Sequence, residues 1–133
     1  MKEEQTVTTL QFFIGLAIAI IIYFIITYVR LNKAVTNLTQ EQFIEGYRKA
    51  QLIDVREPKD FKAGHILGAR NIPYSQLRQR YKEIRPDQPV YLYDQNTGKS
   101  SRTALFLKKK GYTQLYQLNG GFRTWTGKVK TKN

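Results

Sequence analysis

A polar loop between a predicted strand and a predicted helix holds the residues best suited to chemistry in this sequence. It consists of Asp94, Gln95, Asn96, Thr97, Gly98 and Lys99. Residues 90–93 before it are apolar, aromatic or β-branched and predict a strand, and a helix is predicted to begin at Ser100 as its N-cap. Because unpaired backbone N–H groups and a helix dipole converge on such a loop, it favours a bound anion. The sequence therefore predicts an anion cradle whose first side chain, Asp94, is a carboxylate.

A second polar segment, residues 54–57, overlaps the end of another predicted strand, residues 51–55, and contains Asp54 and Arg56. Since ligand crevices lie beyond the carboxyl ends of parallel strands, we expect these two residues and Arg102 to line a crevice beside the cradle. There Arg56 and Lys99 either bind an external anion or form an internal network with neighbouring carboxylates. The carboxylates available to such a network are Asp54, Glu57 and Asp94. We favour the network, because adjacent carboxylates reduce the attraction for external anions.

The composition of the chain excludes several kinds of site. Its 133 residues contain no cysteine and one histidine, His65. Without a thiol the chain cannot form a disulfide, a thiolate nucleophile or a cysteine-bound metal or iron–sulfur centre, and one histidine cannot form a multi-histidine metal site. We therefore expect neither a metal nor a cofactor. His65 is predicted to hydrogen-bond to the backbone rather than to take part in chemistry.

An apolar segment of twenty residues, 10–29, precedes these motifs and carries no formal charge. At about 1.5 Å per residue, a helix of this length spans roughly 30 Å, the thickness of the hydrocarbon core of a bilayer. A buried core helix rarely runs so long without a polar face. A cleaved signal peptide is disfavoured by the acidic Glu3 and Glu4 and by the lack of a small-residue cleavage site. We therefore predict an uncleaved, single-pass transmembrane helix.

The charges that flank the apolar segment predict its orientation. Arg30 and Lys33 follow it closely, whereas Lys2 before it is accompanied by two glutamates. By the positive-inside rule, the C-terminal part of the chain then lies in the cytoplasm and the short N-terminus outside. We predict a protein of the cell membrane with a cytoplasmic C-terminal domain.

Predicted strands and helices alternate after the apolar segment, which is typical of an α/β domain with a mainly parallel sheet and helices on both faces. A capping box of Thr39 and Gln42 begins the first helix. Strands are predicted at residues 51–55, 90–93 and 114–118, and an extended stretch interrupted by Gly68 is predicted at 65–72. Further helices are predicted at 58–63, from 73 to about 84, and from 100 toward 111. The predicted organisation is a short N-terminal segment 1–9, a transmembrane helix 10–29, a juxtamembrane linker 30–37, a domain 38–126 and a basic, disordered tail 127–133.

Four further motifs accompany the cradle in a fixed order. They are Leu52-Ile53-Asp54-Val55-Arg56-Glu57, Asp60-Phe61-x-x-Gly64-His65-Ile66-x-Gly68-Ala69-x-Asn71-Ile72-Pro73, Gly111-Tyr112, and Leu118-Asn119-Gly120-Gly121-x-x-x-Trp125. Together with the cradle they resemble the rhodanese-like (sulfurtransferase) domain family over about residues 38–126. The resemblance implies a three-layer α/β/α fold with a mainly parallel sheet, here preceded by one N-terminal transmembrane helix.

The resemblance also implies where this chain departs from its family. In the family the cradle begins with a cysteine that carries sulfane sulfur as a persulfide, and its six residues usually end in arginine. Here Asp94 stands at the position of the cysteine, Thr97 at that of a frequent glycine and Lys99 at that of the arginine. A carboxylate cannot carry sulfane sulfur, and no recognisable base or metal ligand accompanies Asp94. We therefore predict that the domain has no catalytic residue.

Asp94 has two interpretations. Its carboxylate either fills the cradle from within, so that the loop stays ordered without catalysis, or points into solvent as a relic; we favour the filled cradle. The predicted function is that of a binding, scaffold or regulatory module for an unidentified protein partner. The alternative is a role in sulfane-sulfur transfer, with a partner protein supplying the cysteine.

The formal net charge of +12 predicts an anionic partner. Basic residues gather in three groups along the sequence. They are Arg78, Arg80, Lys82 and Arg85; Lys108, Lys109 and Lys110; and Lys128, Lys130 and Lys132. These groups form either a solvated surface or a surface that docks on anionic lipid headgroups, which a membrane tether favours. Nucleic acid is a weaker prediction, because no nucleic-acid-binding motif accompanies the charge.

Overall fold

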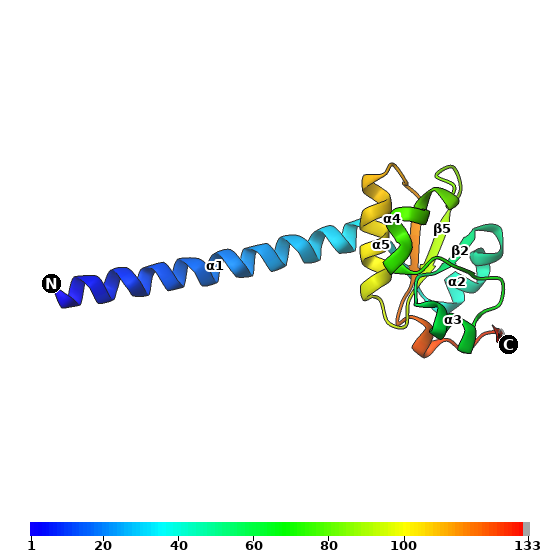
Figure 1. Cartoon of the computed structure of the whole chain (residues 1–133), viewed down its shortest axis with the longest axis horizontal. Coiled ribbons are helices and arrows are strands. Elements are labelled where there is room, and N and C mark those ends of the chain that lie inside the picture. Colours follow the sequence, from blue (N-terminus) through cyan, green and yellow to red (C-terminus); the bar gives the residue numbers. More distant parts are fainter. Residues whose placement is uncertain (132–133) are drawn as a thin grey trace. The chain divides into compact units, whose positions relative to one another are not determined.

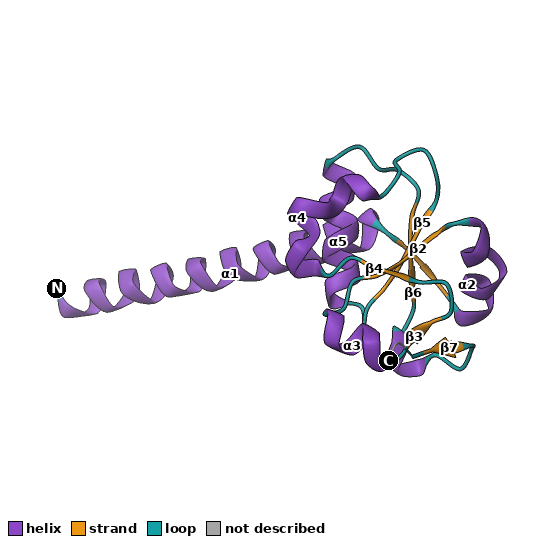
Figure 2. Ribbon diagram, turned by 45° about the vertical axis from the view of Figure 1, so that its right-hand side comes forward, coloured by secondary structure: helices purple, strands orange, loops and turns teal. Residues whose placement is uncertain are grey.

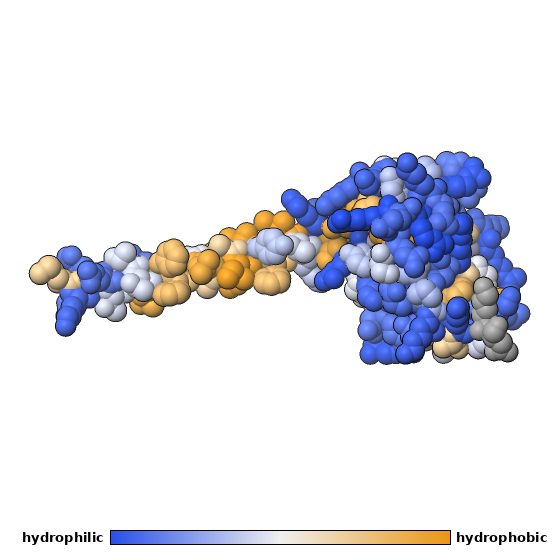
Figure 3. All heavy atoms as spheres, viewed as in Figure 1, coloured by the Kyte–Doolittle hydropathy of each residue, from blue (hydrophilic) through white to orange (hydrophobic). Residues whose placement is uncertain are grey.

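The computed structural model describes residues 1–131, which form two compact units, one from Met1 to Arg30 and one that begins at Leu31 (Figure 1). The first unit consists of most of helix α1 (Lys2–Ala34). Residues Lys2–Leu31 of this helix are long and apolar enough to cross a membrane, with a mean hydropathy of 2.7 in their most apolar stretch. Figure 3 shows apolar side chains along the middle of α1.

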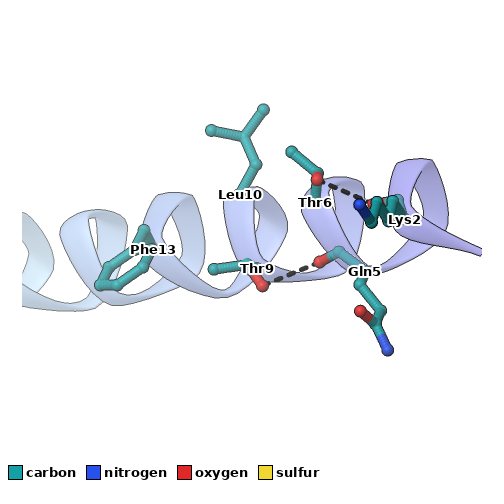
Figure 4. Close-up of a pocket in the computed structure, with 6 residues that line it drawn as sticks. All are labelled: Lys2, Gln5, Thr6, Thr9, Leu10 and Phe13. Carbon is teal, nitrogen blue, oxygen red and sulfur yellow. Dashed lines mark hydrogen bonds between the residues drawn. The ribbon is translucent and has the colours of Figure 1, made fainter.

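Four threonines of α1 satisfy their hydroxyl groups within the helix. Thr6, Thr8, Thr9 and Thr27 each donate a hydrogen bond of 2.8–2.9 Å to the carbonyl oxygen four residues earlier. Such bonds leave no unpaired hydroxyl hydrogen where the helix meets an apolar environment. The hollow beside Thr6 and Thr9 in Figure 4 is lined by residues of this one helix, so it forms no enclosed site.

The second unit is built on a five-stranded parallel sheet with the strand order β1-β6-β5-β2-β4. Its strands are β1 (Thr36–Leu38), β2 (Gln51–Asp54), β4 (Arg70–Asn71), β5 (Val90–Tyr93) and β6 (Leu115–Leu118). A separate antiparallel pair is formed by β3 (His65–Ile66) and β7 (Val129–Lys130). The predicted α/β fold with a mainly parallel sheet is confirmed.

Helices cover both faces of the sheet, as Figure 2 shows. One face carries α4 (Leu77–Arg80) and α5 (Gly98–Lys109), and the other carries α2 (Gln40–Gly46). Helix α3 (Pro58–Ala63) follows the carboxyl end of β2. The connecting 3-10 turns are η1 (Tyr47–Lys49), η2 (Tyr74–Gln76), η3 (Tyr81–Glu83) and η4 (Phe122–Thr124).

Alternation along the central strands divides the core between the two faces. Leu92 of β5 belongs to a buried cluster with Leu77 of α4 and Leu107 of α5. The next residue, Tyr93, belongs to a second cluster with Phe43 of α2. Because successive side chains of a strand point to opposite faces, one buried strand supports both helical layers. The result is the predicted three-layer arrangement, with the loops at the carboxyl ends of the strands free to form a site.

Two segments that the sequence analysis placed outside the domain contain strands of it. Residues 36–37, assigned to the linker, form β1 together with Leu38 at the edge of the sheet, where parallel pairing with β6 supplies backbone partners that no sequence pattern reveals. In the tail, for which disorder was predicted, Val129 and Lys130 pair with Ile66 and His65. The end of the predicted tail, residues 132–133, lies outside the described residues.

Two predicted helices also differ from the structure. Helix α5 begins at Gly98, with Thr97 in the N-cap position, and the hydroxyl of Ser100 donates instead to the side-chain oxygen of Gln117 (2.6 Å). The helix predicted from residue 73 to about 84 is broken into η2, α4 and η3. The predicted interruption of the extended stretch 65–72 is confirmed, because Gly68 turns the chain between β3 and β4 with φ of +91°.

Candidate functional site

The loop that follows β5 closes around the carboxylate of Asp94. Its Oδ1 accepts a hydrogen bond from the backbone N–H of Gln95 (2.7 Å), and its Oδ2 accepts one from the backbone N–H of Lys99 (3.0 Å). Asp94 is buried, with 8% of its surface exposed. The carboxylate therefore lies inside the cradle and at the N-terminus of α5, where the helix dipole stabilises negative charge. This is the geometry that the filled-cradle interpretation requires.

The chain after β6 holds the cradle from its outer side. The backbone N–H groups of Phe122 and Arg123 donate to the carbonyl oxygens of the first two cradle residues, over 2.8 and 3.1 Å. Gly121 lies against the same loop with φ of +70°, and a Cβ at this position would come within 2.1 Å of the carbonyl oxygen of Asn96. Both the conformation and the close approach require glycine. The paired glycines of the last motif thus fix the shape of the cradle.

Gln117 is a buried polar residue that the sequence analysis did not identify. Its side-chain oxygen accepts hydrogen bonds from the hydroxyls of Ser100 (2.6 Å) and Ser101 (3.1 Å), and its side-chain nitrogen donates to Oδ1 of Asn37 (2.5 Å). These bonds tie β6 to the first turn of α5 and to the edge strand β1. A glutamine in the middle of an otherwise apolar and aromatic strand is the signal that points to such a network.

Asp54 and Arg56 form a buried ion pair beside the cradle. Nη2 of Arg56 lies 2.8 Å from Oδ2 of Asp54, and its Nε lies 3.1 Å from both carboxylate oxygens. Burial alone would lower the pKa of Arg56, but the hydrogen bond and the charge of Asp54 raise that pKa above its ordinary value. The expected internal network is present for Arg56, with Asp54 as its carboxylate, but the side chain of Lys99 forms no ion pair among the described residues. Glu57 accepts a hydrogen bond from Ser75 (3.2 Å).

Arg56 also connects the ion pair to three neighbouring segments. Its guanidinium donates to the carbonyl oxygen of Gly64 after α3 (2.6 Å) and to Oε1 of Gln95 in the cradle (3.3 Å). The same group lies 4.2 Å from the centre of the Phe122 ring, in cation–π geometry. The predicted proximity of Asp54 and Arg56 to the cradle is therefore observed, and Gln95 makes the connection.

Tyr93 and His65 are two buried residues next to this network. The Tyr93 hydroxyl accepts a hydrogen bond from the backbone N–H of Ile66 (3.0 Å). The pKa of the Tyr93 phenol is raised well above its ordinary value. Burial is the larger cause, and the negative charge of Asp54 is the next. Nδ1 of His65 donates to the carbonyl oxygen of Phe61 (2.7 Å), and the two rings stack with centroids 3.7 Å apart. The prediction that His65 bonds to the backbone is confirmed.

The remaining cationic candidates lie at the surface. Lys99 and Arg102 are exposed, and neither takes part in an ion pair within residues 1–131. Arg102 stands on α5 one turn beyond the cradle and, unlike Arg56, has no hydrogen bond to it among the described contacts. In the same part of the chain, no group of three or more potential side-chain ligands could hold a metal ion. The site thus consists of an occupied anion cradle, a neutralised buried ion pair and an exposed rim.

A family model for the rhodanese-like domain matches residues 39–128 of this chain. The chain belongs to the rhodanese-like domain family. In this rhodanese-like domain Asp94 holds the position of the family cysteine, and the whole chain lacks cysteine.

Two relatives come from Bacillus subtilis strain 168. The uncharacterized protein YqhL is 60% identical over 114 residues, which cover 86% of this chain and 90% of YqhL. The putative sulfur carrier protein YrkF is 27% identical over 90 residues, which cover 68% of this chain and 49% of YrkF. The match thus covers about half of YrkF and nearly all of YqhL.

Solved structures share the fold. A rhodanese-related protein from Thermoplasma volcanium superposes with a TM-score of 0.66 at 24% identity, over 71% of this chain and 97% of that one. A thiosulfate sulfurtransferase from Pseudomonas aeruginosa superposes with a TM-score of 0.66 at 28% identity, over 74% of this chain and 20% of the enzyme. The rhodanese-like domain here therefore corresponds to one part of a longer enzyme in the second case.

Proposed function

We propose that this protein is a membrane-anchored rhodanese-like domain without sulfurtransferase activity, and that it acts as a binding, scaffold or regulatory module at the cytoplasmic surface of the cell membrane. The observation that carries the proposal is the carboxylate of Asp94, which occupies the backbone donors of Gln95 and Lys99. Sulfane-sulfur transfer requires a polarisable thiolate in that position, and the chain has no thiol.

The apolar helix and its flanking charges support the membrane location. Residues Lys2–Leu31 suffice to cross a bilayer, and Arg30 and Lys33 at the C-terminal end favour a cytoplasmic domain. Protease added to intact cells should therefore leave the domain undigested, whereas digestion in sealed right-side-out cells would reverse the topology.

The outer rim of the cradle is the surface that a protein partner would contact. Gln95, Asn96 and Lys99 are exposed there, while the backbone beneath them is held by Asp94 and by the turn after β6. A rim ordered in advance loses little conformational entropy on binding. The filled cradle thus acts as a rigid support for a recognition loop.

The direct test of the missing activity is covalent sulfur uptake. The full chain is incubated with labelled thiosulfate, and intact-protein mass spectrometry follows the bound sulfur. We expect none on the wild type, and addition of sulfur to Asp94→Cys, which provides a thiol in the same backbone cradle and shows that the assay detects it. Stable transfer of sulfane sulfur to the wild-type chain would refute the proposal.

The binding role is tested by crosslinking and pull-down from native membranes. Lys99→Glu reverses a charge on the rim, and Lys49→Glu makes the same change on the opposite helical layer as a matched control. We expect a specific partner that is captured by the wild type and by Lys49→Glu but lost with Lys99→Glu. Identical capture by both variants would place the binding surface elsewhere.

A role in sulfane-sulfur transfer with a partner's cysteine is the second candidate. It is supported by the similarity to YrkF, described as a putative sulfur carrier protein, and to a thiosulfate sulfurtransferase. It predicts that labelled sulfur reaches a captured partner only when this chain is present. Equal labelling of the partner without this chain would exclude it.

A further inference from the structure

Two basic segments that are separate in the sequence lie side by side in the folded domain. Tyr81 of η3 packs edge-to-face against Phe106 of α5, with ring centroids 5.4 Å apart. The ammonium of Lys110 lies 5.4 Å from the centre of the first ring and 5.5 Å from that of the second. Figure 1 shows α4 and α5 as neighbours. We call this surface the α4/α5 face; its exposed cations are Arg78, Lys82, Arg102, Lys109 and Lys110.

The positive charge of the α4/α5 face is not neutralised by its own carboxylates. Glu83, the acidic residue of this segment, is engaged by Arg80 (2.7 Å) and by Arg70. Helix α5 contains no acidic residue. Within residues 1–131, none of the five cations of the face takes part in an ion pair. The face therefore attracts anions in a way that the cradle, with its own carboxylate, does not.

A pocket of 300 Å³ opens on this face between η2, α4 and α5. It is lined by Tyr74, Ser75, Leu77, Arg78, Gln79 and Phe106. Leu77 and Phe106 are its apolar residues, and Tyr74, Gln79 and Arg78 bring hydroxyl, amide and guanidinium donors. The hydroxyl of Ser75 already donates to Oε2 of Glu57 (3.2 Å). A guanidinium binds phosphate oxygens in two-pronged geometry, and a pocket of this volume suits a small ligand. The lining thus fits a phosphate group with a short polar substituent.

The attachment of the chain favours a lipid as the source of that phosphate. Val35 is buried in the same core cluster as Leu77 and Leu107, so the chain enters the domain in the layer that carries α4 and α5. Three residues separate it from Leu31, where the apolar span ends. At about 1.5 Å per helical residue, the connection between the apolar span and Val35 is only about 6 Å long.

We propose that the pocket of the α4/α5 face binds the phosphate-containing headgroup of an anionic phospholipid, and that the surrounding lysines hold the face against the bilayer. This inference rests on the membrane anchoring proposed above, but not on the absence of sulfurtransferase activity. Each basic residue near an anionic membrane surface contributes about 1 kcal/mol, which corresponds to about fivefold in the docking equilibrium.

The test uses the full chain, labelled with ¹⁵N, in nanodiscs of phosphatidylcholine with or without phosphatidylglycerol. Amide signals of residues 74–79 and 106–110 should shift with the phosphatidylglycerol content. Arg78→Gln should weaken this dependence about fivefold, and Arg123→Gln, an equal charge change in η4, should leave it unaltered. A third arm adds glycerol 3-phosphate to phosphatidylcholine nanodiscs and should produce no saturable shift.

Each other outcome has a defined meaning. Equal effects of the two substitutions would show that the attraction depends on overall charge, and would overturn the proposal that the pocket binds the headgroup. Unshifted signals would overturn the docking while leaving the anchor in place, and saturable shifts with glycerol 3-phosphate would assign the pocket to a soluble phosphate. A chain that fails to co-elute with nanodiscs would refute the anchoring and the inference with it.

Discussion

Replacing Asp94 by alanine should destabilise the domain by an amount set by two backbone groups. The N–H groups of Gln95 and Lys99 have the Asp94 carboxylate as their acceptor, at 2.7 and 3.0 Å. A hydrogen bond to a charged group contributes about 1.5–3 kcal/mol, and a buried donor left unpaired costs about 1–3 kcal/mol. Because both donor residues are exposed, water can replace part of the lost bonding. We therefore expect the free energy of unfolding to fall by about 1–3 kcal/mol in total.

Trp125 provides the signal for this measurement. It is the single tryptophan, and its ring packs edge-to-face against Phe43 and Tyr47, with centroids 6.1 and 6.3 Å away. Urea titration of the full chain in mild detergent, followed by tryptophan fluorescence, gives the unfolding midpoint and slope. A domain of this size loses roughly 4–8 °C of melting temperature per kcal/mol, so a thermal scan should agree.

Two further substitutions make the result interpretable. Asn96→Ala alters an exposed residue of the same loop and should leave the midpoint near that of the wild type. Asp94→Asn keeps one oxygen acceptor but turns an amide donor toward the other N–H. Its free energy of unfolding should therefore fall between those of Asp94→Ala and the wild type. If Asp94→Ala and Asn96→Ala unfold at the same urea concentration with the same slope, the carboxylate does not support the cradle.

Three other substitutions follow from the site. Arg56→Ala leaves the carboxylate of Asp54 buried without its partner and should cost about 3–5 kcal/mol in urea unfolding, whereas an exposed-pair control, Arg85→Ala, should cost under about 1 kcal/mol. Gly121→Ala meets both a positive φ and backbone carbonyl oxygens, so the variant should be recovered mainly unfolded by circular dichroism; near-native melting would refute the close approach. The raised pKa of Tyr93 contributes stability that is complete below the unfolded-state value of about 10 and is lost as the pH rises above it. Tyr93→Phe should therefore reduce the loss of urea stability between about pH 9 and about pH 11; an unchanged loss would show that other groups cause it.

The parts of the fold that local sequence determines were predicted well. The strand at Val90–Tyr93 has the predicted bounds, since four apolar or aromatic residues lie between a proline and a polar loop. The capping box at Thr39 is present, because its two hydrogen bonds join residues three apart. The cradle residues are contiguous, so their placement between strand and helix could also be read directly.

The features that were missed depend on contacts between distant segments. A three-residue stretch such as β1 has no periodicity of its own and becomes a strand only by pairing with β6, some eighty residues away. The pairing of β7 with β3 has the same origin. Gln117 reaches Asn37 and Ser100 across the sheet, and Gly121 meets the cradle from another loop. Sequence spacing alone carries no information on such encounters.

The Asp94 carboxylate and the backbone N–H groups that bind it belong to the same chain. The effective concentration of this carboxylate at the backbone donors is therefore set by geometry and not by the supply of any metabolite. The donors of this loop therefore need no separate ligand to occupy them. Reagents that act on cysteine thiols have no thiol target in this chain.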